Sequence, residues 1–169
     1  EKYDIRSGTA SVMYDSPYHG DYAFSGNIWI ADDGQRLFAR SSNVFRSSES
    51  QADDMTYNGN LANLSSVIWL DQSTAADRVL AFGTNGWSSP PPTSIVVYDS
   101  QYLNLRGTHA LPSYMVPDGS GGGSLEDTEG QFVFMSAAGD RFHALVRVAE
   151  GSGLLLDWGL VSGNIADLP

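Results

Sequence analysis

The sequence contains no cysteine, one lysine and three histidines. Without cysteine, disulfide bonds, thiolate metal sites and cysteine nucleophiles are excluded. The 20 acidic residues against 9 basic ones give a formal net charge of −11, so the surface repels phosphate groups. Nucleic acid and anionic membrane surfaces are therefore not expected partners. No apolar run approaches the roughly 18 residues of a transmembrane helix, so membrane insertion is not expected either.

Sustained helical periodicity is also missing, which argues against an α-rich fold. What the chain has instead is 18 glycines, with Ser, Asn and Asp crowded between short apolar runs. This composition is typical of an all-β protein with many turns. A length of 169 residues corresponds to about one domain. We therefore predict a single all-β domain over residues 1–169, with a flexible loop or linker at 117–130 around a Gly-Ser-rich run.

Three segments share a strand–turn–strand pattern: residues 26–40, 67–82 and 132–145. The second strand of each segment begins with Arg and has Ala three residues later. The pairs are Arg36 and Ala39, Arg78 and Ala81, and Arg141 and Ala144. An alanine suits a position where neighbouring sheets come close together. The aromatic residues of the first strands are expected at equivalent core positions; they are Trp29, Trp69 and Phe134.

Each segment is followed by a further apolar strand, predicted at 44–45, 95–99 and 154–158. The last two of these strands contain Asp directly after an apolar or aromatic residue. Tyr3 and Asp4 have the same arrangement and would be the tail of an earlier, truncated unit. Short strands joined by tight turns at this spacing predict propeller-like blades of antiparallel strands.

Residues 33–39 (Asp-Gly-Gln-Arg-Leu-Phe-Ala) and 95–99 (Ile-Val-Val-Tyr-Asp) resemble blades of bacterial β-propellers of the surface-layer and lactonase-like kind. The resemblance implies about three blades and a partial one, and no particular activity. Closed propellers have about 4–8 blades, so we expect a portion of a larger propeller, with closure by another chain or an open stack of sheets as alternatives. The chain begins with Glu and no leader-like segment follows, so a mature or excised piece is expected.

Candidate binding residues lie on predicted loops. Tyr18 and His19 share a short loop with an acidic residue, and Trp87 stands between Gly and Ser, which favours an exposed position. Asp32 and Asp33 precede a glycine and are candidates for a structural calcium site, because hard cations take carboxylate oxygens. They lack the spacing of a calcium-binding loop, so a turn stabilised by Asp side chains is the simpler interpretation. No other cofactor is expected.

The leading hypothesis is a non-enzymatic scaffold, or a ligand- or protein-binding module, of an extracellular or cell-envelope protein. Long loops near 16–21, 85–93 and 112–130 would form its binding surface. One alternative is part of a propeller hydrolase or lyase, although no metal-spaced histidine pair or Ser-His-Asp arrangement is evident. The other is a carbohydrate-binding module that uses Tyr18 and Trp87. The expected partners are a protein or glycan ligand, another copy of the chain, or the remaining blades of a longer one.

Overall fold

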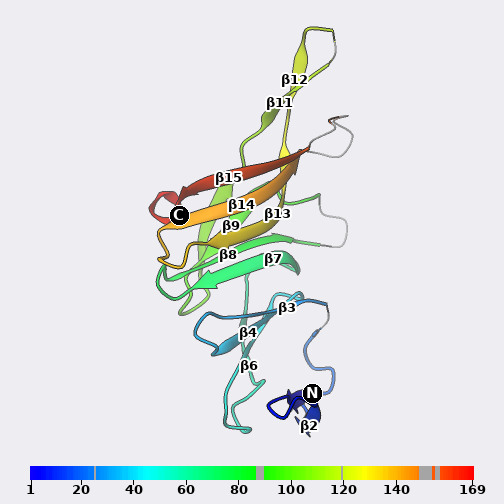
Figure 1. Cartoon of the computed structure of the whole chain (residues 1–169), viewed down its shortest axis with the longest axis vertical. Coiled ribbons are helices and arrows are strands. Elements are labelled where there is room, and N and C mark those ends of the chain that lie inside the picture. Colours follow the sequence, from blue (N-terminus) through cyan, green and yellow to red (C-terminus); the bar gives the residue numbers. More distant parts are fainter. Residues whose placement is uncertain (25, 87–89, 119, 149–153, 155–156) are drawn as a thin grey trace. The chain divides into compact units, whose positions relative to one another are not determined.

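The computed structural model describes residues 1–169 apart from 25, 87–89, 119, 149–153 and 155–156 (Figure 1). The described residues form antiparallel strands and one short 3-10 helix, which confirms the predicted all-β fold. None of their helices is long and apolar enough to cross a membrane. The chain divides into two compact units, residues 1–60 and 61–169, which are taken one at a time below. The single-domain expectation stays a prediction.

The N-terminal unit contains a hairpin and a four-stranded sheet. The hairpin is β1 (Lys2–Asp4) and β2 (Ser11–Tyr14). The sheet is a meander in which each strand pairs with the next one in sequence. Its strands are β3 (Ile28–Ile30), β4 (Arg36–Ala39), β5 (Asn43–Arg46) and β6 (Tyr57–Asn60).

The C-terminal unit contains a second four-stranded meander, a small hairpin and a three-stranded meander. The first meander is β7 (Ser66–Ser73), β8 (Arg78–Thr84), β9 (Ser94–Tyr98) and β10 (Leu105–Ala110). The hairpin is β11 (Tyr114–Pro117) and β12 (Gly123–Glu126). The last meander is β13 (Thr128–Met135), β14 (Arg141–Val148) and β15 (Trp158–Asn164), followed by the 3-10 helix η1 (Ile165–Asp167). These meanders are consistent with the propeller-like blades that the repeat predicts.

The repeated Arg and Ala mark the second strand of each meander. β4, β8 and β14 begin at Arg36, Arg78 and Arg141, as predicted. Each of these strands has a neighbour on both sides, and the three alanines are at most 1% exposed. One small side chain therefore occupies the same buried position in the second strand of each sheet.

Side chains alternate between the two faces of a strand, so the repeated Arg gives the sheets a common reference. We call "front" the face that carries the side chains two and four residues after this Arg. We call "back" the face that carries the side chains one and three residues after it. Leu80 and Phe82 thus lie on the front of β7–β10, and Phe142 and Ala144 lie on the back of β13–β15.

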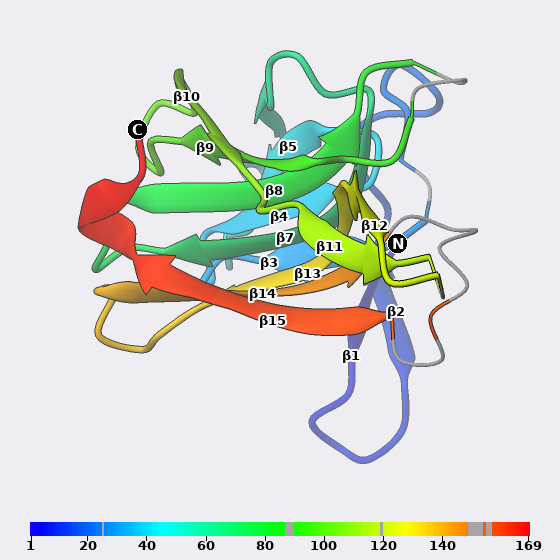
Figure 2. The same cartoon turned by 90° about the horizontal axis from the view of Figure 1, so that it is seen from above.

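In the C-terminal unit the front of β7–β10 packs against the back of β13–β15, with β13 in contact with β7, β8 and β9 (Figures 1 and 2). The two faces form one buried core, to which η1 adds Ile165. The sheets approach closely at Gly130, where a Cβ atom would overlap the ring of Phe82. The facing core residues are Leu80, Phe82, Ile95 and Val97 on one sheet, and Val133, Phe142, Ala144 and Val146 on the other.

The expected equivalence of the three first-strand aromatics is wrong in one case. Trp29 lies opposite Phe38, and Phe134 lies opposite His143, in both cases two residues after the Arg. Trp69 instead lies opposite Phe82, four residues after the Arg, because it precedes its Arg by nine residues, whereas Trp29 and Phe134 precede theirs by seven. The shift of two residues keeps Trp69 on the same face. Phe134 is 41% exposed and so is not a core residue.

Two further expectations need correction. Residues 117–130 do not form one loop or linker, since they include all of β12 and the start of β13. The carboxylate of Asp118 accepts hydrogen bonds from the backbone N–H groups of Ser120 and Gly122, which closes a hairpin turn inside the Gly-rich run. The last strand lies at Trp158–Asn164 rather than at 154–158, of which residues 155 and 156 are outside the described part of the chain.

Tyr98 and Asp99 show what the repeated strand ending does. The Tyr98 side chain is fully buried, and its hydroxyl donates to the carbonyl oxygen of Ala62 at 2.6 Å. The Asp99 carboxylate accepts from the backbone N–H groups of Tyr102 and Asn104 and so closes the turn into β10. Asp4, at the end of β1, accepts from its own following turn through the N–H group of Arg6 in the same way.

Tyr98→Phe is expected to lower the free energy of unfolding of the C-terminal unit by about 1 kcal/mol, the usual worth of one neutral hydrogen bond. Urea titration followed by backbone amide NMR would measure it. Tyr102→Phe is the matched control, because that side chain is 72% exposed and should cost nothing measurable. Equal effects of the two changes would contradict a specific role for the Tyr98 hydroxyl.

Candidate functional site

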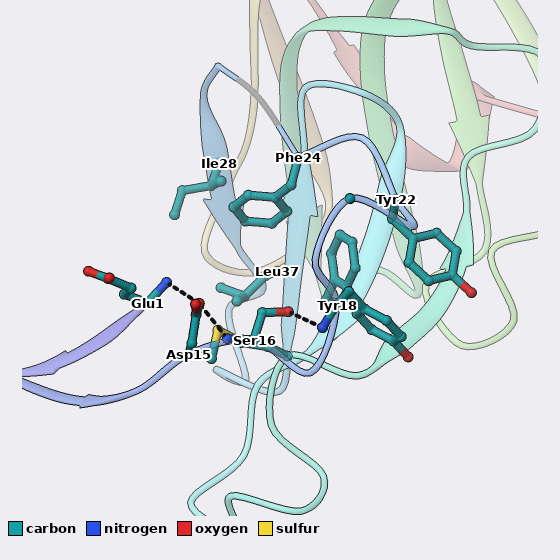
Figure 3. Close-up of a pocket in the computed structure, with 11 residues that line it drawn as sticks. Glu1, Asp15, Ser16, Tyr18, Tyr22, Phe24, Ile28 and Leu37 are labelled. Atoms are coloured by element: carbon teal, nitrogen blue, oxygen red, sulfur yellow. Dashed lines mark hydrogen bonds and ion pairs between the residues drawn. The ribbon is translucent and has the colours of Figure 1, made fainter.

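The back of the β3–β6 sheet carries a pocket with a volume of about 420 Å³ (Figure 3). Its wall consists mainly of aromatic and aliphatic side chains from the loop before β3 and from the sheet itself. These are Tyr18, Tyr22, Phe24, Ile28, Leu37, Phe45 and Met55. Glu1, Asp15, Ser16 and Gly20 add polar groups and backbone. The predicted loop at 16–21 therefore contributes directly to the pocket.

Hydrogen bonds hold this loop over the sheet. The backbone N–H of Tyr57 in β6 donates to the hydroxyl of Tyr18 at 3.0 Å. At the other end of the loop, the side-chain amide of Asn43 in β5 donates to the carbonyl oxygen of Ala23 at 2.9 Å. The Oγ of Ser16 accepts from the N–H of Tyr18 within the loop. The sheet therefore positions the aromatic side chains between these anchor points.

The aromatic rings form a connected cluster. Tyr22 stacks on Tyr57 with ring centroids 4.2 Å apart and an interplanar angle of 8°. Tyr18 meets Tyr22 edge to face at 4.7 Å, and Phe24 meets Phe45 in the same manner at 5.2 Å. Such arrangements contribute about 0.5–1.5 kcal/mol per pair beyond the burial of area. Phe45 is 3% exposed, whereas Phe24 is 53% exposed, so the pocket has a buried floor and an open rim.

Asp15 supplies a carboxylate at the edge of the pocket. It accepts a hydrogen bond from the backbone N–H of Ser16 and lies 3.4 Å from the amino group of Glu1 (Figure 3). The Ser16 N–H and then this amino group lower the pKa of Asp15 from its ordinary value. The carboxylate is therefore ionised at neutral pH and is not suited to act as a general acid.

The sequence-predicted residues divide among several places. Tyr18 lines the pocket, whereas His19 is exposed and does not belong to the pocket wall. Trp87 lies outside the described residues. The carboxylate of Asp33 accepts from the N–H of Gln35 and stabilises the turn it begins, and the neighbouring Asp32 is exposed. No group of three or more His, Asp or Glu side chains in the described part of the chain could hold a metal ion, and a structural calcium stays a prediction.

Sequence reasoning missed most of the pocket wall. Tyr22 and Phe24 follow Tyr18 in an otherwise polar loop, and three aromatic residues within seven positions are a signal that could have drawn attention to it. Phe45 and Met55 carry no such signal. Their side chains reach the pocket only because β5 and the chain before β6 lie beneath the loop.

A serine–histidine pair bears on the hydrolase alternative. The Nδ1 of His143 lies 2.8 Å from the Oγ of Ser162, across β14 and β15 on the front of their sheet. A hydrolytic Ser-His pair also needs a third group that orients the histidine. It needs, in addition, hydrogen-bond donors that stabilise an oxyanion. Within the described ranges, no carboxylate is hydrogen-bonded to His143.

The described residues therefore form a mainly apolar pocket with a buried floor, an open rim and an ionised carboxylate, Asp15, at its edge. No protein-family model matches the chain, and a search of the curated proteins gave no significant match.

Proposed function

We propose that the protein is a non-enzymatic binding module of an extracellular or cell-envelope protein, built on propeller blades. Its aromatic pocket on the back of β3–β6 would receive an apolar side chain of a protein partner. The observation that carries this proposal is a partly open hollow of about 420 Å³ with mainly aromatic and aliphatic walls. Ligand sites in proteins are commonly concave, mostly apolar and about 300–1,000 Å³ in volume.

Apolar side chains at the rim of the pocket are exposed to solvent, and a partner that covers them would gain hydrophobic free energy. Phe24 and Ile28 are 53% and 49% exposed although both line the pocket. Full burial of such a side chain yields about 1.5–3 kcal/mol, and a partner that covers both would recover on the order of half of that from each. The hydrophobic effect therefore favours an apolar ligand here.

The alternatives have less support at this site. The Tyr18 hydroxyl already accepts a hydrogen bond, and its ring packs against Tyr22, so Tyr18 is part of the wall rather than an open platform for a sugar. A hydrolase or lyase would need an acid and a base with opposed pKa values. The lowered pKa of Asp15 keeps this carboxylate ionised at the rim, so Asp15 does not supply the acid of such a pair.

Binding can be tested with small analogues of apolar side chains. Met55 lines the pocket, so ¹³C-methyl methionine labelling places an NMR signal on a residue of its wall. Titration with indole and with 4-methylphenol is expected to shift the Met55 signal in a saturable manner. The signals of Met13, Met115 and Met135, which do not line the pocket, should stay in place.

A pair of variants tests whether the pocket causes the shift. Phe24→Ala should weaken indole binding about tenfold, because it removes an aromatic wall worth on the order of 1–1.5 kcal/mol. Tyr102→Ala removes an aromatic side chain that is 72% exposed in the other unit and should leave the affinity unchanged. A Met55 signal that does not respond to either analogue would refute the proposal, and a response to oligosaccharides alone would support the carbohydrate alternative.

A further inference from the structure

The packing in the C-terminal unit defines how one blade receives the next. The front of β7–β10, with Leu80 and Phe82, covers the back of β13–β15, with Phe142 and Ala144. The front side chains stand two and four residues after the repeated Arg in β8. The back side chains that they contact stand one and three residues after the repeated Arg in β14. The same numbering applies to β3–β6, whose second strand also begins with this Arg.

By this rule, the back of β3–β6 is a surface that receives a front where the loop over it leaves the sheet open, along β3. On β4 this face carries Leu37 and Ala39, which stand one and three residues after the repeated Arg. On β3 it carries Ile30 opposite Leu37 and Ile28 opposite Ala39. Ile28 is 49% exposed and Ile30 is 65% exposed, and the aromatic pocket opens on this face. Two adjacent isoleucines on one strand face are therefore left in contact with solvent.

The front of β13–β15 is the complementary surface. It carries His143 and Leu145 in β14, with Phe134 beside them in β13 and Leu160 in β15. The exposed fractions are 41% for Phe134, 36% for Leu145, 55% for Trp158 and 63% for Leu160. Trp158 lies opposite Arg147, so it belongs to the same face. The sheet thus presents four large apolar side chains, whereas the equivalent front of β7–β10 is covered.

We infer that the protein partner of the pocket is a second copy of this chain, whose β13–β15 front docks on the β3–β6 back. The inference rests on the proposed function and names the partner. Charge also fits, because the receiving face has ionised Asp15 at its rim, while the docking face carries Arg141. Arg147 on the same face is already paired with Asp157.

Charged substitutions on the two faces test the contact. The wild-type protein should show, by sedimentation velocity between about 1 and 100 μM, a concentration-dependent rise from the monomer mass of 18.2 kDa to twice that value. Leu160→Glu on the front and Ile30→Glu on the back should each remain monomeric over this range. Leu125→Glu, at a side chain that is 67% exposed on β12, is the matched control and should associate as the wild type does.

Mixing the two monomeric variants separates this contact from other dimers. A front-to-back contact uses different surfaces on the two partners. The Leu160→Glu chain keeps an intact back and the Ile30→Glu chain keeps an intact front, so an equimolar mixture should form a heterodimer. A front-to-front dimer would be abolished by Leu160→Glu and untouched by Ile30→Glu, and this result would overturn the inference. Circular dichroism of each variant should match the wild type.

The proposed function is tested by a separate measurement, the indole titration. Indole should still shift the Met55 methyl signal in monomeric Leu160→Glu, because the pocket of that variant is unchanged. A wild-type protein that stays at 18.2 kDa at all concentrations would overturn the inference, and the indole titration would then decide the proposed function alone.

Discussion

Phe82→Ala is expected to lower the free energy of unfolding of the C-terminal unit by about 3–5 kcal/mol, the usual cost of removing a buried phenyl ring. Phe82 is fully buried between the two packed sheets, and its ring fills the space beside Gly130. Urea titration followed through backbone amides of residues 61–169 would measure the loss. Phe134→Ala is the matched control, because this ring is 41% exposed and should cost much less.

A double-mutant cycle identifies the contact behind this effect. Gly130→Ala alone should cost about 1–3 kcal/mol, because the new methyl group overlaps the Phe82 ring. In the Phe82→Ala background the ring is gone, so the same change should cost little. Additive losses would mean that the sheets do not meet at Gly130 and Phe82.

Asp54→Ala is expected to lower the free energy of unfolding of the N-terminal unit by about 1.5–3 kcal/mol, as for lost hydrogen bonds to a charged group. Asp54 is 2% exposed and ties the β1–β2 hairpin to the chain before β6. Its carboxylate accepts from Lys2 Nζ at 2.9 Å, from Tyr14 Oη at 3.1 Å and from the Ser48 N–H at 2.7 Å. Amide signals of residues 1–60 in a urea titration would report the change.

The same network has a defined pH dependence. Burial raises the pKa of Asp54, but the hydrogen bonds from Lys2, Ser48 and Tyr14 outweigh it, so the pKa is lowered in the folded protein. Its stabilising contribution is therefore complete above the ordinary pKa of about 3.9 and is lost as the pH falls through the lower, folded value. The hydrogen bond to Asp54 raises the pKa of Lys2, so the contribution of Lys2 is complete below about 10.4 and is lost at higher pH.

Asp53→Ala is a suitable control, because Asp53 is exposed next to the network and its carboxylate takes no part in it. Its unfolding curve should match that of the wild type at neutral pH. If Asp54→Ala kept the acid sensitivity of residues 1–60, other carboxylates would have to account for that sensitivity.

The sequence repeat predicted the central strands well because they depend on local pattern. Arg followed by apolar residues, with Ala three residues after it, specifies the second strand of each sheet, and β4, β8 and β14 begin where expected. The hairpin of β11 and β12 was missed for a physical reason. Its Gly-rich composition is typical of a linker, whereas the turn depends on one side chain, Asp118, which accepts two backbone hydrogen bonds.

The pocket could be predicted only in part. Tyr18 was recognised on its loop, but the arrangement depends on hydrogen bonds between residues about 20 to 39 positions apart, such as those from Asn43 and Tyr57. Local pattern carries no information about such pairings. The faces of the sheets, in contrast, followed from strand alternation once the register was known.

The sequential pairing of strands affects how the protein folds during translation. Within every meander each strand pairs with its immediate predecessor, so no blade has to wait for a distant segment of the chain. Contacts between sequence neighbours close small loops and favour fast folding. We expect each blade to form soon after its own last strand leaves the ribosome, so that a nascent chain exposes at most one incomplete sheet at a time during translation.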